Sequence, residues 1–179
     1  MQLWCGLIAG RPPNDRAWCI FADVSNGLSQ SNSVAAIGDA NTGEKLGQFV
    51  SASTDAAEFA RVLAMLGLWF QGVSGPALVG WESNGPGGIV GEHLRRVKYP
   101  RVWCDEHGRA GWHSSKDSKR NLIENLSAAY RRNEFHEVDV ATVTEAQDYV
   151  YTPSGGVEPV KLQSEREARG THGDRVIAT

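Results

Sequence analysis

The sequence has 179 residues, of which 41% are hydrophobic and 22% charged, and its formal net charge is −3 at pH 7. This size and composition indicate one globular domain. They exclude a membrane-spanning protein, because no apolar run reaches the roughly 18 residues that a bilayer requires. The N-terminus lacks the basic stretch of a secretory signal. The three cysteines of the chain form no C-x-x-C pair, and their odd number argues against a disulfide framework.

Three strands are predicted in the first part of the chain. One ends at Asp23, the second covers residues 33–39, and the third begins at Lys45. The turn between the last two contains Asn and Gly, so it predicts a hairpin. The same turn resembles a phosphate-binding loop. However, Gly43 is followed by Glu44, and the segment joins two strands instead of opening a helix. We therefore predict no nucleotide triphosphatase.

A helix and a buried strand are predicted next. Asp55 starts the helix, and Glu58 lies three residues later, as in a capping box. Apolar residues then recur at spacings of three and four, which indicates one buried helical face. Residues 77–81 are apolar on both faces, which favours a strand in the middle of a covered sheet. The apolar positions of the helix are Phe59, Val62, Leu63, Leu66 and Phe70.

The second half of the chain continues the alternation of helices and strands. After Glu82, Pro86 suits a first helical position and Asn84 a cap. Together the elements predict an α/β fold: a three-strand antiparallel meander plus parallel strands, in a mixed sheet flanked by helices. The later elements expected are a strand over 101–106, a helix over 118–133 with Leu122, Ile123, Leu126 and Tyr130 inward, a strand-turn-strand unit over 148–162, and the start of a helix within 171–179.

Three acidic residues stand out, although each has an ordinary explanation by itself. Asp23 could start a turn, Glu82 could stabilise a helix N-terminus, and Asp174 could form a capping box with Thr171. Asp23 and Glu82 also lie at C-terminal strand ends, where sites gather in sheets with parallel strands. A third carboxylate at the start of a helix would complete a cluster.

Such a cluster of acids stays ionised only when a cation compensates its charge. Oxygen ligands favour Mg²⁺ or Mn²⁺ over Zn²⁺, and pairs of these ions promote phosphodiester cleavage. His172 could assist next to Asp174, although a solvent-exposed histidine is as good an interpretation. The other four histidines show no zinc-ligand spacing.

Four motifs, in order, carry a resemblance to a known family. "FADVSNG" (21–27), "WESNGPGG" (81–88), "GWHSSKDSKRNLIENL" (111–126) and "THGDRVIA" (171–178) resemble segments of the nuclease domains of tailed-bacteriophage large terminases. The second resembles the family's Glu-x-Asn-x-x-Gly motif after the central strand. The last resembles its closing His-x-Asp-x-x-x-Ala motif.

The resemblance implies an RNase H-like fold over residues 1–179 and a two-metal endonuclease that cuts concatemeric double-stranded viral DNA during packaging. It carries Asp23, Glu82 and Asp174 over as ligands of two Mg²⁺ or Mn²⁺ ions. It also implies a terminase ATPase domain, a small terminase subunit and a portal as partners in the host bacterial cytoplasm. The sequence departs from the family in lacking the ATPase half and in ending at Thr179, where the family continues a longer helix.

Basic residues near the acids are the expected DNA contacts, since the net charge of −3 makes any attraction local. Two alternatives stay open: an RNase H-fold nuclease of repair or recombination, and a non-catalytic DNA-docking module of the packaging motor. The expected DNA-binding residues are Lys116, Lys119, Arg120 and Arg175.

Overall fold

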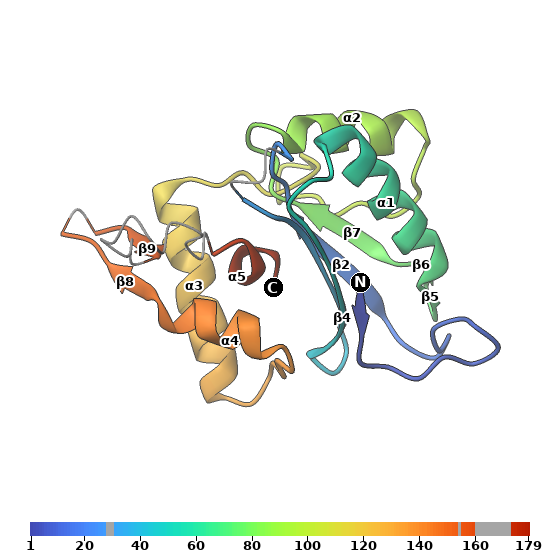
Figure 1. Ribbon diagram of the computed structural model, residues 1–179, viewed down its shortest axis with the longest axis horizontal. Helices are drawn as coiled ribbons and strands as arrows, with labels where there is room; N and C mark the ends of the chain where they lie inside the picture. The colour runs from blue at the N-terminus through green and yellow to red at the C-terminus, as the bar shows by residue number, and fades with distance from the viewer. Residues whose placement is uncertain (28–30, 154, 160–172) are drawn as a thin grey trace.

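A five-stranded sheet forms the centre of the protein (Figure 1). The computed structural model describes residues 1–27, 31–153, 155–159 and 173–179. The strands of this sheet are β1 (Gln2–Leu3), β2 (Trp18–Asp23), β3 (Ser33–Asp39), β4 (Glu44–Ser51) and β7 (Leu78–Trp81). They lie in the order β1-β4-β3-β2-β7. Only β2 and β7 are parallel, and the other neighbours are antiparallel. The predicted combination of a meander with a parallel strand is therefore confirmed.

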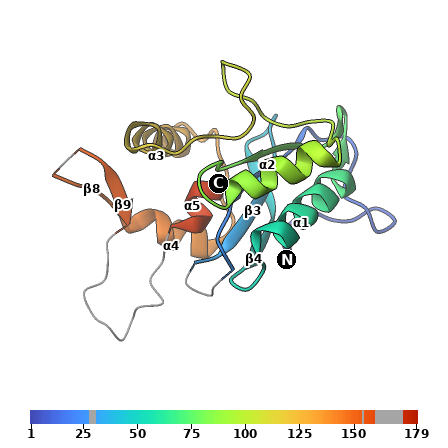
Figure 2. The ribbon, with the colours of Figure 1, turned by 90° about the horizontal axis from the view of Figure 1, so that it is seen from above.

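Two helices, α1 (Ala56–Trp69) and α2 (Gly87–Arg96), cover one face of the sheet (Figures 1 and 2). The predicted helical periodicity of α1 places its apolar residues inward. Phe59 and Leu63 of α1 and Val90 of α2 are fully buried. They belong to one apolar core with the sheet residues Ile20, Ile37 and Val79.

The opposite face carries α5 (Asp174–Ala178), with α4 (Val140–Gln147) and α3 (Lys116–Arg131) farther from the sheet (Figure 1). Helix α5 packs against β2 and β3, and its Ala178 is fully buried in a small apolar cluster of that face. This arrangement brings the end of the chain against strands formed near its beginning.

Two short hairpins complete the fold. Strands β5 (Gln71–Gly72) and β6 (Gly75–Pro76) pair after α1, and β8 (Tyr149–Tyr151) pairs with β9 (Val157–Pro159) after α4. The second pair confirms the predicted strand-turn-strand unit as far as Pro159, and its last residues, 160–162, lie outside the described residues. None of the helices in the described part of the chain has both the length and the apolar character needed to cross a bilayer.

The predicted strand over 101–106 is wrong, and β7 is the last strand of the sheet instead of a middle one. Only one residue of this segment, Val102, forms a bridge to β7, at Val79. The chain then reverses direction, because the Asp105 amide donates to the Arg109 carbonyl at 2.9 Å. The segment therefore pairs with the outer side of β7 only around Val102, where the Val79 amide donates to the Arg101 carbonyl at 2.9 Å and the Trp103 amide donates to the Val79 carbonyl at 2.8 Å.

The predicted helix over 118–133 has different ends, Lys116 and Arg131. The hydroxyls of Ser115 and Ser118 each accept a hydrogen bond from the other residue's amide, which is a capping box that starts the helix at Lys116. None of the residues of α3 is fully buried, so its predicted inward residues are only half-buried. Helix α4 was not predicted.

Candidate active site

Asp23 and Glu82 lie side by side at the end of the sheet where the parallel strands β2 and β7 terminate. Their strands are parallel neighbours, with Ala22 opposite Trp81, so Asp23, the last residue of β2, and Glu82, the residue after β7, lie at the same level. The Glu82 amide donates to the Ala22 carbonyl at 2.8 Å, which continues the pairing past the strand end. This is the arrangement expected from the sequence.

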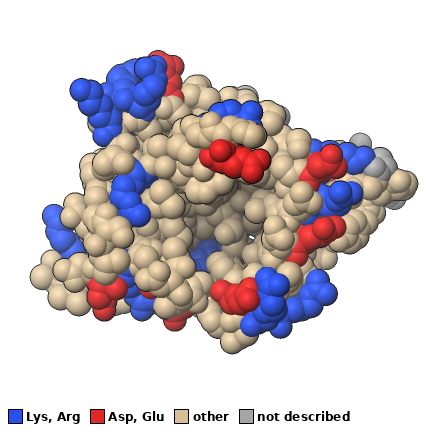
Figure 3. Space-filling view, turned by 180° about the vertical axis from the view of Figure 1, so that it is seen from behind, with Lys and Arg blue, Asp and Glu red and all other residues tan. Residues whose placement is uncertain are grey.

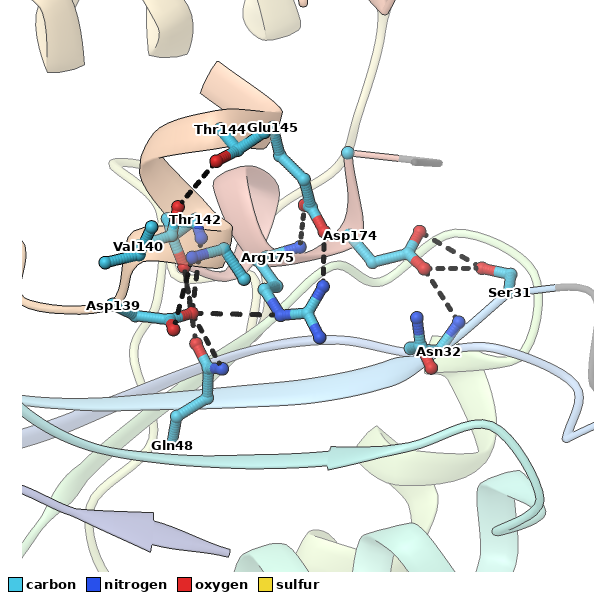
Figure 4. Close-up of polar contacts among 12 residues, drawn as sticks. Ser31, Asn32, Gln48, Asp139, Val140, Thr142, Thr144, Glu145, Asp174 and Arg175 are labelled. Carbon is cyan, nitrogen blue, oxygen red and sulfur yellow. Dashed lines mark hydrogen bonds and ion pairs between the residues drawn. The ribbon is translucent and has the colours of Figure 1, made fainter. Parts of the chain in front are cut away.

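Asp174 reaches the same end of the sheet from α5. Asp23 pairs with Val34 of β3, and the residues just before β3 hold the Asp174 side chain. Its carboxylate accepts hydrogen bonds from the Ser31 hydroxyl, at 3.0 Å to each oxygen, and from the Asn32 amide at 2.7 Å (Figure 4). Asp174 is only 6% exposed. The third acid is therefore fixed by the loop that ends at β3.

The charges of these acids act on one another. Burial raises the pKa of Asp23 to about 8, and the negative charges of Glu82 and Asp174, with a hydrogen bond to Glu82, add to the increase. A carboxylic acid whose ionisation is suppressed by neighbouring carboxylates ionises readily beside a cation. The donors are all oxygen atoms, which fits a hard divalent ion such as Mg²⁺ or Mn²⁺.

The carboxylates of Asp23, Glu82 and Asp174 do not surround a common centre. Within residues 1–27, 31–153, 155–159 and 173–179, no three His, Cys, Asp or Glu side chains stand in metal-ligand geometry. Asp174 is turned toward Ser31 and Asn32 (Figure 4). Its oxygens keep lone pairs beyond these hydrogen bonds, so the carboxylate retains the capacity to bind a cation.

The structure of the loop after Glu82 explains why the motif over residues 81–88 contains Gly87 and Asn84. A Cβ atom on Gly87 would lie 1.8 Å from the Glu82 carbonyl oxygen, so only glycine permits α2 to start so close. Asn84 does not cap α2, in contrast to the prediction. Its side chain accepts from the Ser114 amide at 2.7 Å and donates to the Ser114 carbonyl at 2.9 Å. Asn84 thus ties the Glu82 loop to the segment before α3.

Tyr149, at the start of β8, contacts the site but was not predicted. Its hydroxyl donates to the Gly173 carbonyl at 3.3 Å, next to Asp174. Burial, followed by the charges of Asp23, Glu145, Asp174 and Glu82, raises the pKa of Tyr149. A tyrosine within a predicted hairpin gives no sequence signal for such a contact.

The expected DNA-binding residues divide into two groups. Lys116, Lys119 and Arg120 lie on α3, toward the β8–β9 hairpin. The Lys119 ammonium lies 5.9 Å from the centre of the Tyr149 ring, and Arg120 donates to the Gly155 carbonyl at 3.3 Å. In the space-filling view, acidic and basic side chains are interspersed around a central hollow (Figure 3).

Arg175 does not fit its expected role as a DNA contact. Its guanidinium forms an ion pair with Glu145 at 2.6 Å and lies 3.8 Å from Asp139, with the side chain 24% exposed. The side chain therefore points to α4 and away from solvent (Figure 4). The other expected residue at this end, His172, lies outside the described residues, as does Thr171.

The fold and the acids at its edge define the class as an RNase H-like α/β domain. Solved structures with this fold include the large terminase nuclease of thermophilic phage G20c, with a TM-score of 0.65 and 20% identity over 92% of this chain and 79% of that chain. The Thermus phage P74-26 large terminase nuclease domain has a TM-score of 0.62 and 16% identity over 94% of this chain and 82% of that chain.

The HK97 bacteriophage large terminase is also similar, with a TM-score of 0.59 and 11% identity over 94% of this chain and 39% of that chain. The G20c nuclease has further been solved with bound cobalt, magnesium and zinc. A scan against protein-family models and a search of curated proteins give no match. This chain has the fold of phage large-terminase nuclease domains, and the fold prediction is confirmed.

Proposed function

We propose that this chain is a metal-dependent endonuclease that cleaves double-stranded viral DNA concatemers during genome packaging. The observation that supports it most directly is the approach of Asp23, Glu82 and Asp174 to one edge of the sheet. The fold supports it further, because the similar structures are terminase nucleases, one of them solved with divalent metals.

The proposed ligands of two Mg²⁺ or Mn²⁺ ions are Asp23, Glu82 and Asp174. Such ions lower the pKa of an attacking water and stabilise the leaving 3′ oxygen. The protein's own contribution is to hold the carboxylates. Asp23, with a pKa of about 8 in the metal-free protein, loses its proton when positive charge arrives. The parallel pairing of β2 with β7 fixes Asp23 and Glu82 relative to each other.

We propose that DNA contacts come from Lys116, Lys119 and Arg120. These residues lie on one helix, and Lys119 reaches the Tyr149 ring beside Asp174. Phosphate contacts of this kind position DNA without reading its sequence, so cleavage should show little sequence preference. Binding should weaken steeply as salt increases. Arg175 is left out of the set because its guanidinium is bound to Glu145.

The proposed partners follow from the family of the similar structures. They are a terminase ATPase domain, a small terminase subunit and a portal, acting on DNA in the host cytoplasm. We expect no ATP hydrolysis by residues 1–179 themselves. The segment that resembles a phosphate-binding loop forms the β3–β4 turn, in which Asp39 pairs with Glu44.

The test is plasmid nicking in Mn²⁺ by the wild type, Asp23→Asn, Glu82→Gln and Asp174→Asn at equal concentration. Each substitution keeps the shape and removes a charge, so each should lower the rate by orders of magnitude. Chelator should abolish wild-type activity, and Ca²⁺ should support little cleavage because its coordination is longer and looser.

The results also separate the alternatives. Equal nicking by all four proteins would mean that these acids are not the catalytic site. DNA binding by all four without cleavage would instead favour the docking module. Equal nicking of packaging concatemers and of branched or damaged DNA would favour a repair or recombination nuclease.

A further inference from the structure

Helix α5 begins without a capping side chain of its own. Its N-cap residue is Gly173, which has a φ of 74° and forms no side-chain cap. In most helices the N-cap side chain accepts the amide of the second or third helical residue. Here Glu145 of α4 accepts the Arg175 amide at 3.0 Å. Glu145 therefore supplies from another helix the contact that Gly173 lacks.

The same carboxylate also binds the Arg175 side chain. Glu145 Oε1 accepts from Arg175 Nη1 at 2.6 Å, while Oε2 binds the backbone amide. The Glu145 side chain is only 4% exposed. Two bonds to the backbone and side chain of one residue fix both the position and the rotation of the first turn of α5.

This rotation decides where Asp174 points. Consecutive residues of an α-helix project about 100° apart. Figure 4 shows Arg175 directed toward α4 and Asp174 directed away from it, toward Ser31 and Asn32. Holding Arg175 against Glu145 thus directs the Asp174 carboxylate to the edge where Asp23 and Glu82 end their strands.

Tyr149 contacts the same turn from the same side. It follows Glu145 by four positions, and its hydroxyl donates to the Gly173 carbonyl at 3.3 Å. The segment from Glu145 to Tyr149 therefore holds the residues immediately before and after Asp174.

We propose that Glu145 is a positioning residue for Asp174, acting through the amide and guanidinium of Arg175. The inference rests on the proposed function, since it assigns Asp174 to the cation site. Groups that orient a metal ligand typically affect metal affinity or activity by about 10- to 100-fold when they are removed. Glu145 has the contacts of such a group.

A neighbouring ion pair provides a matched control. Glu137 binds Lys45 of β4 at 3.0 Å, and both side chains are 1% exposed. This pair is at least as buried as the pair of Glu145 with Arg175, and it also joins the α4 region to the rest of the fold. Glu137 makes its side-chain bonds to Lys45 and to the Asp139 amide, so it contacts none of residues 173–175 directly, although Asp139 lies 3.8 Å from the Arg175 guanidinium. Its loss should destabilise the fold without turning Asp174.

The experiment compares the full chain as wild type, Glu145→Gln, Glu137→Gln and Asp174→Asn. Mn²⁺ affinity is measured by calorimetry, and Tm is measured in chelator. We expect both glutamate variants to lower Tm. Glu145→Gln should also weaken Mn²⁺ binding by about tenfold or more, whereas Glu137→Gln should keep the wild-type affinity. Asp174→Asn should weaken binding at least as much as Glu145→Gln.

The inference is overturned if Glu145→Gln lowers Tm but binds Mn²⁺ as tightly as Glu137→Gln does. In that case the proposed function survives, provided that Asp174→Asn still weakens binding. Equal affinity of Asp174→Asn and the wild type overturns both, because Asp174 is then no ligand. Should Glu145→Gln not fold, Glu145→Asp keeps the charge but shortens the side chain. The Glu145→Asp variant should still bind Mn²⁺ more weakly than the wild type does. Equal Mn²⁺ affinity of Glu145→Asp and the wild type would overturn the inference.

Discussion

The two faces of the central sheet are built from different chemistry. On the α1–α2 face, Phe59, Leu63 and Val79 are fully buried in a continuous apolar core. On the α4–α5 side, buried polar groups join the elements: Lys45 binds Glu137, and Gln48 and Thr142 bind the carboxylate that caps α4. Apolar packing is non-directional, whereas hydrogen bonds fix orientation. The face that carries Asp174 is the one built from directional contacts.

The largest effect expected on stability is on the apolar face. Phe59→Ala removes a fully buried ring and leaves a cavity, which costs about 3–5 kcal/mol. For a chain of this size, we expect Tm to fall by about 6–20 °C. The Mn²⁺ affinity of the folded protein should stay unchanged, as calorimetry below the transition can check. A large loss of affinity would mean that the two faces are coupled, in contradiction to the comparison.

The next largest effect expected is a pH dependence of stability. It arises from Asp23 at the end of β2, a strand that both faces of the sheet share. The pKa of Asp23 is raised from 3.8 to about 8. Between these values the folded protein keeps a proton that the unfolded chain has released, so the metal-free protein should lose stability as pH rises. Asp23→Asn removes this titration. At pH 8 in chelator, its Tm should exceed the wild-type value by at least about 2–4 °C, the shift that 1 kcal/mol produces.

As a control, the Tm values of the wild type and Asp23→Asn are also measured at pH 4, where Asp23 is largely protonated in the folded wild type. The difference in Tm should be much smaller there. A difference that is equal at pH 4 and pH 8 would show that Asp23 does not titrate in this range.

The smallest effect concerns one hydrogen bond on the polar side. Ser31→Ala removes the hydroxyl that donates to both oxygens of Asp174 and leaves the Asn32 amide in place. One hydrogen bond contributes about 0.5–1.5 kcal/mol, so Mn²⁺ affinity should change by about two- to tenfold. Ser53→Ala, on an exposed residue whose amide bonds to Ser51 and which forms no hydrogen bond with Asp174, is a suitable control. If both variants have the same affinity, Ser31 has no role in aiming Asp174.

The same contrast explains which parts of the fold could be predicted from the sequence. Helix α1 was predicted because its buried residues are apolar and recur with helical spacing. Helix α4 is not predicted because its buried residues are polar and its exposed residues are apolar, the reverse of the usual pattern. Its buried residues are Thr142 and Glu145, while Val140 is 78% exposed and Val143 is 40% exposed. A hydrophobic pattern cannot identify a helix whose inward face is polar.

The site divides in the same way. Asp23 and Glu82 could be placed together because both end predicted strands, and parallel strands end at one edge. Ser31, Glu145 and Tyr149 could not be found, because nothing in their local sequence distinguishes them from surface residues. The pair of Arg175 with Glu145 also reversed the expected role of a basic residue, since the partner lies in the helix that was missed.

The way α5 returns to the first strands has a consequence for the order in which the protein folds. Ser31 and Asp174 are in contact although 143 residues separate them in sequence. Contacts between distant residues form slowly, because a long loop must close first. During synthesis, β2, β3 and β7 emerge from the ribosome well before α5. The nascent chain therefore carries Asp23 and Glu82 before Asp174, and the three acids come together only after α5 has been made.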